Sequence, residues 1–231
     1  MSVVYTTKGA CHRLLKKIFD IAKNNPLFQE ITFSDFEPML NCLSSKTTAY
    51  RKSDIILLSG DSINFVGLIL SGSIKIIRED MNGNSSILAK LAASEIFGEV
   101  FACAEVFHSP VTVQAIEETE VLFIDYSKIF TSCTNACHFH NRLIKNMLKL
   151  VAQKNLMLNQ KIEILSKRTT RDKLLCFFDF QRGASNAVTI PFNREEMANY
   201  LCVDRSAMSN ELCKMRDDGL IRFNKNYFEI L

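Results

Sequence analysis

The sequence lacks the features that would assign it to several common protein classes. No apolar run approaches the roughly 20 residues that a membrane-spanning helix needs. Its first residues have neither the hydrophobic segment nor the small-residue cleavage site of a secretory signal. It also has no P-loop, no dinucleotide-binding fingerprint and no nucleophile–base motif. We therefore expect a cytoplasmic protein that is not an enzyme and makes no contact with a membrane.

The sequence also has no large excess of positive or negative charge. The 28 Lys and Arg residues nearly balance the 25 Asp and Glu residues, which leaves a net charge of +3. Any contact with nucleic acid must therefore come from a local basic cluster. The eight cysteines are scattered among apolar neighbours. In a cytoplasmic chain this favours buried thiols over a disulfide framework.

The most informative stretch, residues 193–217, reads as two short helices joined by a tight turn. Asn193 followed by Glu196 is typical of a capping box at the start of a helix. Asp204 can cap the second helix, and Gly219 can end it in the left-handed conformation. The pattern predicts a helix-turn-helix, whose second helix can enter the major groove of DNA. An ordinary helical hairpin is the alternative.

The neighbouring segments favour the helix-turn-helix. A short β segment, 187–191, precedes it, and residues 220–230 read as two strands around an Asn-Lys-Asn turn. Those two strands would form the wing of a winged helix.

The first half of the chain has a different pattern of predicted secondary structure. An amphipathic helix within residues 1–25 and a second helix capped by Ser34 precede a series of short β-rich runs between residues 47 and 125. Asn82-Gly83 suits the tight turn of a hairpin, and residues 96–102 form a short helical break. Strands at this spacing predict a sandwich or a barrel.

A long helix, about 139–166, joins the two halves. One apolar stripe alternates in steps of four and three, namely Ile144, Leu148, Val151, Asn155, Leu158, Ile162 and Leu165. Its single polar member, Asn155, occupies an a position, where Asn fixes register and favours two strands. A second stripe of Leu143, Met147 and Leu150 can cover the β domain. We therefore favour a parallel homodimer over a helix that lies only on its own domain.

From about residue 26 to 231 this order resembles the Crp/Fnr family of bacterial transcription regulators. The resemblance rests on short motifs in the right order, namely Ser59-Gly60-Asp61, Leu70-Ser71-Gly72, Phe97-Gly98-Glu99, the long helix, and Val203-Asp204-Arg205 through Asp218-Gly219-Leu220-Ile221. It implies an α+β fold with a β-roll of the cyclic-nucleotide-binding type over 1–138, a dimerisation helix over 139–166, and a winged helix-turn-helix over 167–231. It also implies a homodimer that binds palindromic double-stranded DNA, responds to a small effector and contacts RNA polymerase.

The resemblance also places the residues that contact DNA, namely Asn193, Arg194, Arg205, Ser206, Ser209, Asn210 and Lys214. Arg205 would read guanine through O6 and N7, whereas Asn210 suits adenine. Asn193, Arg194 and Lys214 would contact phosphate, which sets register but reads no sequence.

The corresponding effector pocket would comprise Phe97, Gly98, Glu99, Ser109 and Pro110. In the branch that binds cyclic AMP, an Arg-Ser pair grips the cyclic phosphate where this chain has Ser109-Pro110, and hydroxyls on the long helix read the adenine. Residues 143–165 contain no Ser or Thr. We therefore expect an effector other than cyclic AMP. Gly98 and Glu99 could instead simply turn the chain.

One cysteine and histidine cluster remains, formed by Cys133, Cys137, His138 and His140. Its spacing misses that of common zinc sites, so we favour packed thiols and a helix-capping His over a metal site. No cofactor is specified by the sequence. The alternative function is a ligand-, metal- or redox-sensing module whose helix-turn-helix contacts protein. Arg205 and the wing favour DNA.

Overall fold

The computed structural model describes residues 8–80, 82, 85–130, 138–182 and 185–231. By its contacts the chain divides into two compact units, residues 1–151 and 152–231, which are described separately below. The long helix α5 (His138–Ser166) contributes to both. None of the helices described is both long and apolar enough to cross a membrane.

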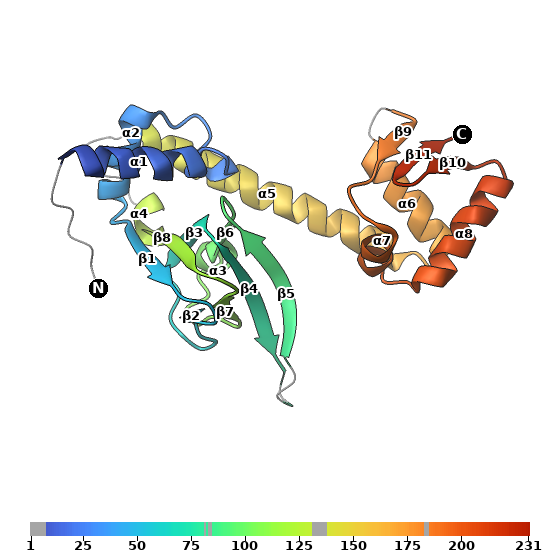
Figure 1. Ribbon diagram of the computed structural model, residues 1–231, viewed down its shortest axis with the longest axis horizontal. Coiled ribbons are helices and arrows are strands. Elements are labelled where there is room, and N and C mark those ends of the chain that lie inside the picture. Colours follow the sequence, from blue (N-terminus) through green and yellow to red (C-terminus); the bar gives the residue numbers. More distant parts are fainter. Residues whose placement is uncertain (1–7, 81, 83–84, 131–137, 183–184) are drawn as a thin grey trace. The chain divides into compact units, whose positions relative to one another are not determined.

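The first unit contains a β-roll of two four-stranded antiparallel sheets (Figure 1). In order across the first sheet lie β1 (Lys46–Tyr50), β8 (Thr119–Asp125), β3 (Phe65–Ser71) and β6 (Ile96–Phe97). In order across the second lie β2 (Ile55–Leu57), β7 (Thr112–Ala115), β4 (Ser73–Glu79) and β5 (Ser85–Ala92). The expected β-rich region and the hairpin between β4 and β5 are confirmed. Of the residues predicted for the hairpin turn, Gly83 lies outside the described part.

Helices precede and follow the β-roll in the sequence, and one lies between its strands β6 and β7. They are α1 (Lys8–Ala22), the 3-10 helix η1 (Pro26–Phe28), α2 (Phe33–Cys42), α3 (Glu99–Cys103) and α4 (Tyr126–Phe130). The predicted cap of α2 was wrong by two residues. Thr32 is the N-cap, and its hydroxyl accepts from the Asp35 amide at 3.3 Å. Ser34 lies inside the first turn, where its own hydroxyl is 2.9 Å from that of Thr32.

Strand β3 is buried on both of its faces because it lies between two cores. Val66, Leu68 and Leu70 belong to the core under the helices, whereas Ile69 belongs to the core between the sheets. The second stripe of α5 joins the core under the helices, with Leu143, Met147 and Leu150 all buried. Burying each of these side chains contributes about 1.5–3 kcal/mol. The prediction that this stripe covers the β domain is therefore confirmed.

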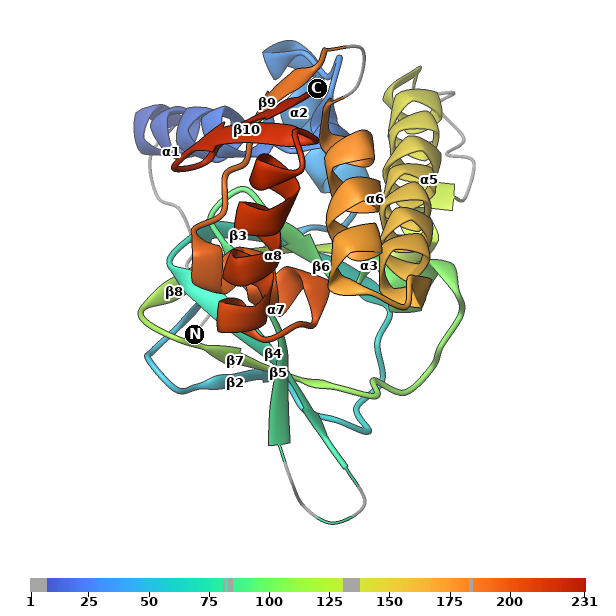
Figure 2. The same cartoon turned by 90° about the vertical axis from the view of Figure 1, so that its right-hand side faces the viewer.

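The second unit is a winged helix (Figure 2). Its elements in chain order are α6 (Thr170–Arg182), β9 (Ala187–Thr189), α7 (Arg194–Leu201), α8 (Arg205–Asp217), β10 (Ile221–Asn224) and β11 (Tyr227–Ile230). The strands form one sheet in the order β10-β11-β9. The predicted wing is confirmed, and Lys225 in its turn has a φ of 53°.

The predicted caps of the helix-turn-helix are present. The Asn193 side chain accepts from the Glu196 amide at 2.9 Å, and the Glu196 carboxylate accepts from the Asn193 amide at 2.8 Å. Asp204 accepts from the Ala207 amide at 2.8 Å, and Gly219 follows α8 with a φ of 74°. Caps of this kind are each worth about 1 kcal/mol. They fix where α7 and α8 begin, and so which side chains their first turns present.

Candidate DNA-binding site and effector region

A cleft of about 700 Å³ lies where the first turns of α7 and α8 meet the tip of the wing. Its lining residues are Asn193, Arg194, Glu195, Arg205, Lys225 and Asn226. Three of them are cations and one is a carboxylate, so the cleft is positive although the whole chain is nearly neutral. A local positive cleft of this kind attracts phosphate.

Arg205 begins α8 directly after the Asp204 cap. Its side chain is 64% exposed, and its Nε lies 3.6 Å from Oε2 of Glu195 on α7. On the same helix Ser206, Asn210 and Lys214 are exposed and Ser209 is half-buried, whereas Met208, Leu212 and Met215 are buried in the core of the unit. One face of α8 thus holds the helix in place, and the other presents polar side chains to solvent.

Arg194 has a structural role that the sequence analysis missed. Its guanidinium lies 4.9 Å from the ring centre of Phe228 and 5.1 Å from that of Phe223, and its Nη2 donates to the Lys225 carbonyl at 3.1 Å. Burial against these rings lowers the pKa of Arg194 from its usual value. The residue therefore ties the first turn of α7 to the wing. The only sequence signal was an aromatic residue on each wing strand.

The predicted DNA contacts fall into two groups. Asn193, Arg194 and Arg205 come together in the cleft, and the cleft also contains Glu195, Lys225 and Asn226, which were not predicted. Ser206, Ser209, Asn210 and Lys214 lie on α8 outside the cleft lining. The Asn-Lys-Asn turn was recognised as the wing tip, but its distance from α7 could not be read from the sequence.

The predicted effector residues Phe97, Gly98 and Glu99 lie where β6 leads into α3. Phe97 is buried between the sheets, and a Cβ placed on Gly67 would come within 2.4 Å of its ring. The rings of Phe65, Phe97 and Phe123 pack edge to face, so aromatic side chains occupy this part of the interior. Gly98 has a φ of 85°, which suits Gly, and Glu99 is only 3% exposed.

Ser109 uses its hydroxyl within its own loop. It is buried, its Oγ donates to the Val111 carbonyl at 2.7 Å, and the same Oγ accepts from the Val111 amide at 3.3 Å. A hydroxyl has a single proton to donate, and here that proton is engaged. The adjoining Pro110 is exposed and has no N–H.

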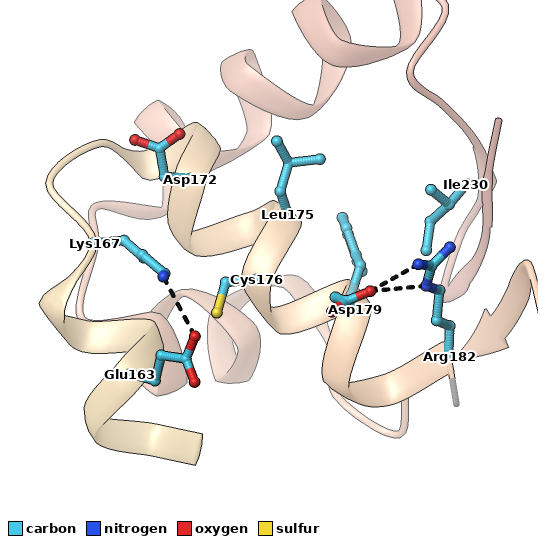
Figure 3. Close-up of a pocket in the computed structure, with 9 residues that line it drawn as sticks. Glu163, Lys167, Asp172, Leu175, Cys176, Asp179, Arg182 and Ile230 are labelled. Carbon is cyan, nitrogen blue, oxygen red and sulfur yellow. Dashed lines mark hydrogen bonds and ion pairs between the residues drawn. The ribbon is translucent and has the colours of Figure 1, made fainter. Parts of the chain in front are cut away.

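A second cleft, of about 500 Å³, is also part of the winged-helix unit (Figure 3). It lies among the end of α5, α6 and β11, and its lining includes Leu175 and Cys176. Both of its cations are paired, with Lys167 3.4 Å from Glu163 and Arg182 2.8 Å from Asp179. Together with Asp172, the lining has three acids and two bases, so this cleft does not favour phosphate.

Of the cysteine and histidine cluster, Cys133, Cys137 and the side chain of His138 lie outside the described residues. His140 is buried, with Nε2 3.1 Å from the Lys128 carbonyl and 3.9 Å from Sγ of Cys42. Its Nδ1 has no hydrogen-bond partner within the described part of the chain. Among the described residues, no group of three or more His, Cys, Asp or Glu is arranged to hold a metal ion.

The side chains of the predicted seam on α5 differ in exposure along the helix. Leu148, Leu158 and Ile162 are 62–64% exposed, although leucine and isoleucine are usually buried. Ile144 and Val151 pack half-buried against the first unit's core. Two further apolar side chains beside the seam, Leu156 and Met157, are also exposed. An apolar stripe left in solvent along a helix is typical of an interaction surface.

Two family models match the chain in the same order as the structural units. Residues 47–135 match the cyclic nucleotide-binding domain, and residues 170–231 match the Crp-like helix-turn-helix domain. The chain belongs to the Crp/Fnr family of transcription regulators. It is thus a transcription regulator that combines a cyclic-nucleotide-binding-type domain with a DNA-binding helix-turn-helix.

Relatives in the family are distant. The chain is 22% identical over 188 residues to the transcriptional activator protein FnrA of Stutzerimonas stutzeri, a match that covers 78% of this chain and 75% of that protein. It is also 22% identical over 211 residues to the cyclic AMP receptor protein of Thermus thermophilus, covering 90% and 93%. The crystal structure of the Thermus thermophilus catabolite activator protein has the same fold, with a TM-score of 0.53 at 20% identity over 90% of this chain and 94% of that one.

Proposed function

We propose that this regulator acts as a homodimer, that it reads a palindromic DNA operator through α8, and that an effector other than cyclic AMP controls it. The observation that carries the proposal is the positive cleft at the wing, with the exposed Arg205 at the start of α8. RNA polymerase is the further partner that such a regulator would contact at a promoter.

The exposed face of α8 supplies the base-reading groups. Arg205 can donate two hydrogen bonds to O6 and N7 of a guanine, and Asn210, nearly one and a half turns later, can pair with adenine. Asn193, Arg194, Lys214 and the newly found Lys225 would hold the phosphate backbone on either side. Ser206 and Ser209, which are short, would contribute hydrogen bonds at close approach.

The dimer would form along α5. Burying Leu148, Leu158 and Ile162 against a second copy would contribute about 1.5–3 kcal/mol for each side chain. Asn155 is exposed, and its Oδ1 accepts from Asn159 at 2.9 Å, which leaves the Asn155 amide group able to donate across a twofold axis. A symmetric dimer reads two half-sites related by the same axis, so the operator would be an inverted repeat.

The control site would be in the β-roll, but cyclic AMP does not suit it. A cyclic phosphate needs charge-assisted donors, and Ser109-Pro110 offers neither a guanidinium nor a free hydroxyl proton. The relative from Thermus thermophilus is named for cyclic AMP, yet at 22% identity the name alone does not carry its ligand to this chain.

Selection of binding sites from a random-sequence DNA pool tests the DNA-reading proposal. The purified chain should enrich an inverted repeat that contains a guanine in each half, and Arg205→Ala should enrich no such guanine. Enrichment of no sequence by the wild-type chain would contradict the proposal. The helix-turn-helix would then be a protein-contact surface, which is the alternative function.

A further inference from the structure

We propose that Glu195 is a specificity-determining positioning residue, which holds the Arg205 side chain so that its terminal fork faces a guanine. The proposal rests on the DNA-reading function proposed above and assigns a role to a residue that the sequence analysis did not single out. Its starting point is the approach of Glu195 Oε2 to Arg205 Nε, at 3.6 Å across the cleft.

The atoms involved make this pairing compatible with base reading. A guanidinium carries five N–H groups, one on Nε and two on each terminal nitrogen. The carboxylate of Glu195 faces Nε, which leaves the N–H groups of Nη1 and Nη2 for the two acceptors of guanine. One arginine can therefore contact the carboxylate and the base at the same time.

The Glu195–Arg205 ion pair contributes little to the stability of the fold. A role in positioning Arg205 therefore explains its presence better than a stabilising role. Its side chains are 64% and 65% exposed, and exposed ion pairs contribute about 0–1 kcal/mol. An arginine side chain that is free in solution, however, loses about 2 kcal/mol of rotamer entropy when it is fixed. Holding Arg205 before DNA arrives reduces that loss at the moment of binding.

A carboxylate at this place also has a cost, which the cleft offsets. Glu195 lies beside Arg194 and opposite Lys225, where phosphate is expected, and a negative charge there repels the DNA backbone. The repulsion acts on every DNA sequence alike, whereas the support for Arg205 acts only where guanine is present. The repulsion weakens binding to all sequences and cancels in their affinity ratio, so only the support for Arg205 raises the discrimination between a guanine site and other DNA.

The caps of the two helices fix the geometry of the pair. Asn193 and Glu196 define the first turn of α7, and Asp204 defines that of α8, so the backbones that carry Glu195 and Arg205 are both held by side-chain hydrogen bonds. Glu196 is engaged in its own cap at 2.8 Å and cannot replace Glu195. The contact therefore depends on a single side chain.

A double-mutant cycle on DNA tests the proposal. The probes are the operator obtained by selection with the wild-type chain and the same operator with its read guanine replaced by adenine, each measured by fluorescence anisotropy at matched salt. Glu195→Gln should lower the guanine-over-adenine affinity ratio about fivefold, the order expected when one long side chain is no longer pre-ordered. It should also strengthen binding to random DNA. In the Arg205→Ala background, Glu195→Gln should leave the ratio unchanged.

The matched control is Glu163→Gln, in the second cleft. Glu163→Gln removes the same group from a similarly spaced ion pair, 3.4 Å long, in the second cleft, and it should change neither the ratio nor the binding to random DNA. An unchanged ratio in Glu195→Gln would show that Glu195 contributes only its charge. An equal fall in the Arg205→Ala background would show that Glu195 does not act through Arg205, and either result would overturn the proposal. Failure of the wild-type chain to discriminate at all would overturn the proposed function, and this inference with it.

Discussion

The β-roll and the winged helix use their polar groups in opposite ways. At the predicted effector region, Ser109 donates to its own loop and Glu99 is buried at 3% exposure, and aromatic rings occupy the neighbouring interior. At the wing cleft, the side chain of Arg205 is 64% exposed. In the first region the polar groups are buried and engaged within the chain. In the second region they are exposed and can contact a partner.

This difference has a physical reason. A buried polar group must find its partners inside the protein, because leaving it unpaired costs about 1–3 kcal/mol. A site whose donors are already engaged therefore offers a ligand little net gain. By contrast, each contact between an exposed cation of the cleft and a DNA phosphate makes the free energy of binding more favourable, because counterions are released from the DNA. We therefore expect the winged helix to bind DNA strongly. We expect the β-roll to bind cyclic nucleotides weakly or to bind a different ligand.

The largest effect on DNA binding is expected from replacing Arg205 by Ala. It removes the exposed base-reading group, so operator affinity should fall by about 1–3 kcal/mol for each half-site, while the fold remains intact because the side chain packs in no core. Fluorescence anisotropy and a thermal melt would measure both. Arg182→Ala, in the second cleft, is the matched control and should bind like wild type. Wild-type affinity in Arg205→Ala would show that α8 does not dock as proposed.

The comparison extends to α5, where an exposed Asn155 lies among exposed apolar residues. If the seam forms, Asn155→Ile should stabilise the dimer by about 1–2 kcal/mol, because a buried polar pair is replaced by an apolar one. The same change should loosen the register and allow higher oligomers. Analytical ultracentrifugation and thermal melts would detect this, with Asn159→Ala as the control that removes only the intrahelical bond. An unchanged melting temperature would place Asn155 outside the seam.

A titration with cyclic AMP tests whether the β-roll still binds a cyclic nucleotide. Isothermal calorimetry should show no binding up to about 1 mM, which corresponds to an affinity weaker than about −4 kcal/mol. The physical reason is the engaged hydroxyl of Ser109 and the missing N–H of Pro110. Titration of the same sample with operator DNA would confirm that the protein is active. Micromolar binding of cyclic AMP would contradict the contrast between the two regions.

The smallest effect is expected from the cysteine and histidine cluster. Cys133→Ser with Cys137→Ser should leave DNA affinity within about threefold of wild type, a difference under roughly 0.7 kcal/mol. Affinity should be measured under reducing and oxidising conditions, each with and without zinc. Dependence on redox state or zinc in wild type that disappears in the double variant would identify the cluster as a sensor. It would also give the first unit a control site other than the predicted effector region of the β-roll.

Local features of the sequence predicted much of this fold. The Asn193–Glu196 capping box, the Asp204 cap and the wing turn were all recognisable, because each depends on residues within a few positions of one another. Strand β1 (Lys46–Tyr50) was not identified, because its polar residues and its mixed burial lack a clear period of two. The helix α4 (Tyr126–Phe130) is too short to show a helical period.

The candidate site was predictable only in part, for a related reason. Arg205 was identified through the resemblance to the Crp/Fnr family, but its contact with Glu195 joins two helices and could not be read from the sequence. The stacking of Arg194 on Phe223 and Phe228 spans about thirty residues of sequence, and no local pattern encodes it. Contacts that depend on tertiary packing set the shape of the cleft, and these needed the structure.

Native mass spectrometry of the wild-type chain with its selected operator would show directly whether the regulator reads DNA as a homodimer. We expect a complex of two chains on one inverted repeat, and much weaker binding to a duplex that carries a single half-site, because both recognition helices must dock together. A complex with one chain for each duplex, bound equally well to the half-site, would contradict the claim that this regulator reads DNA as a homodimer.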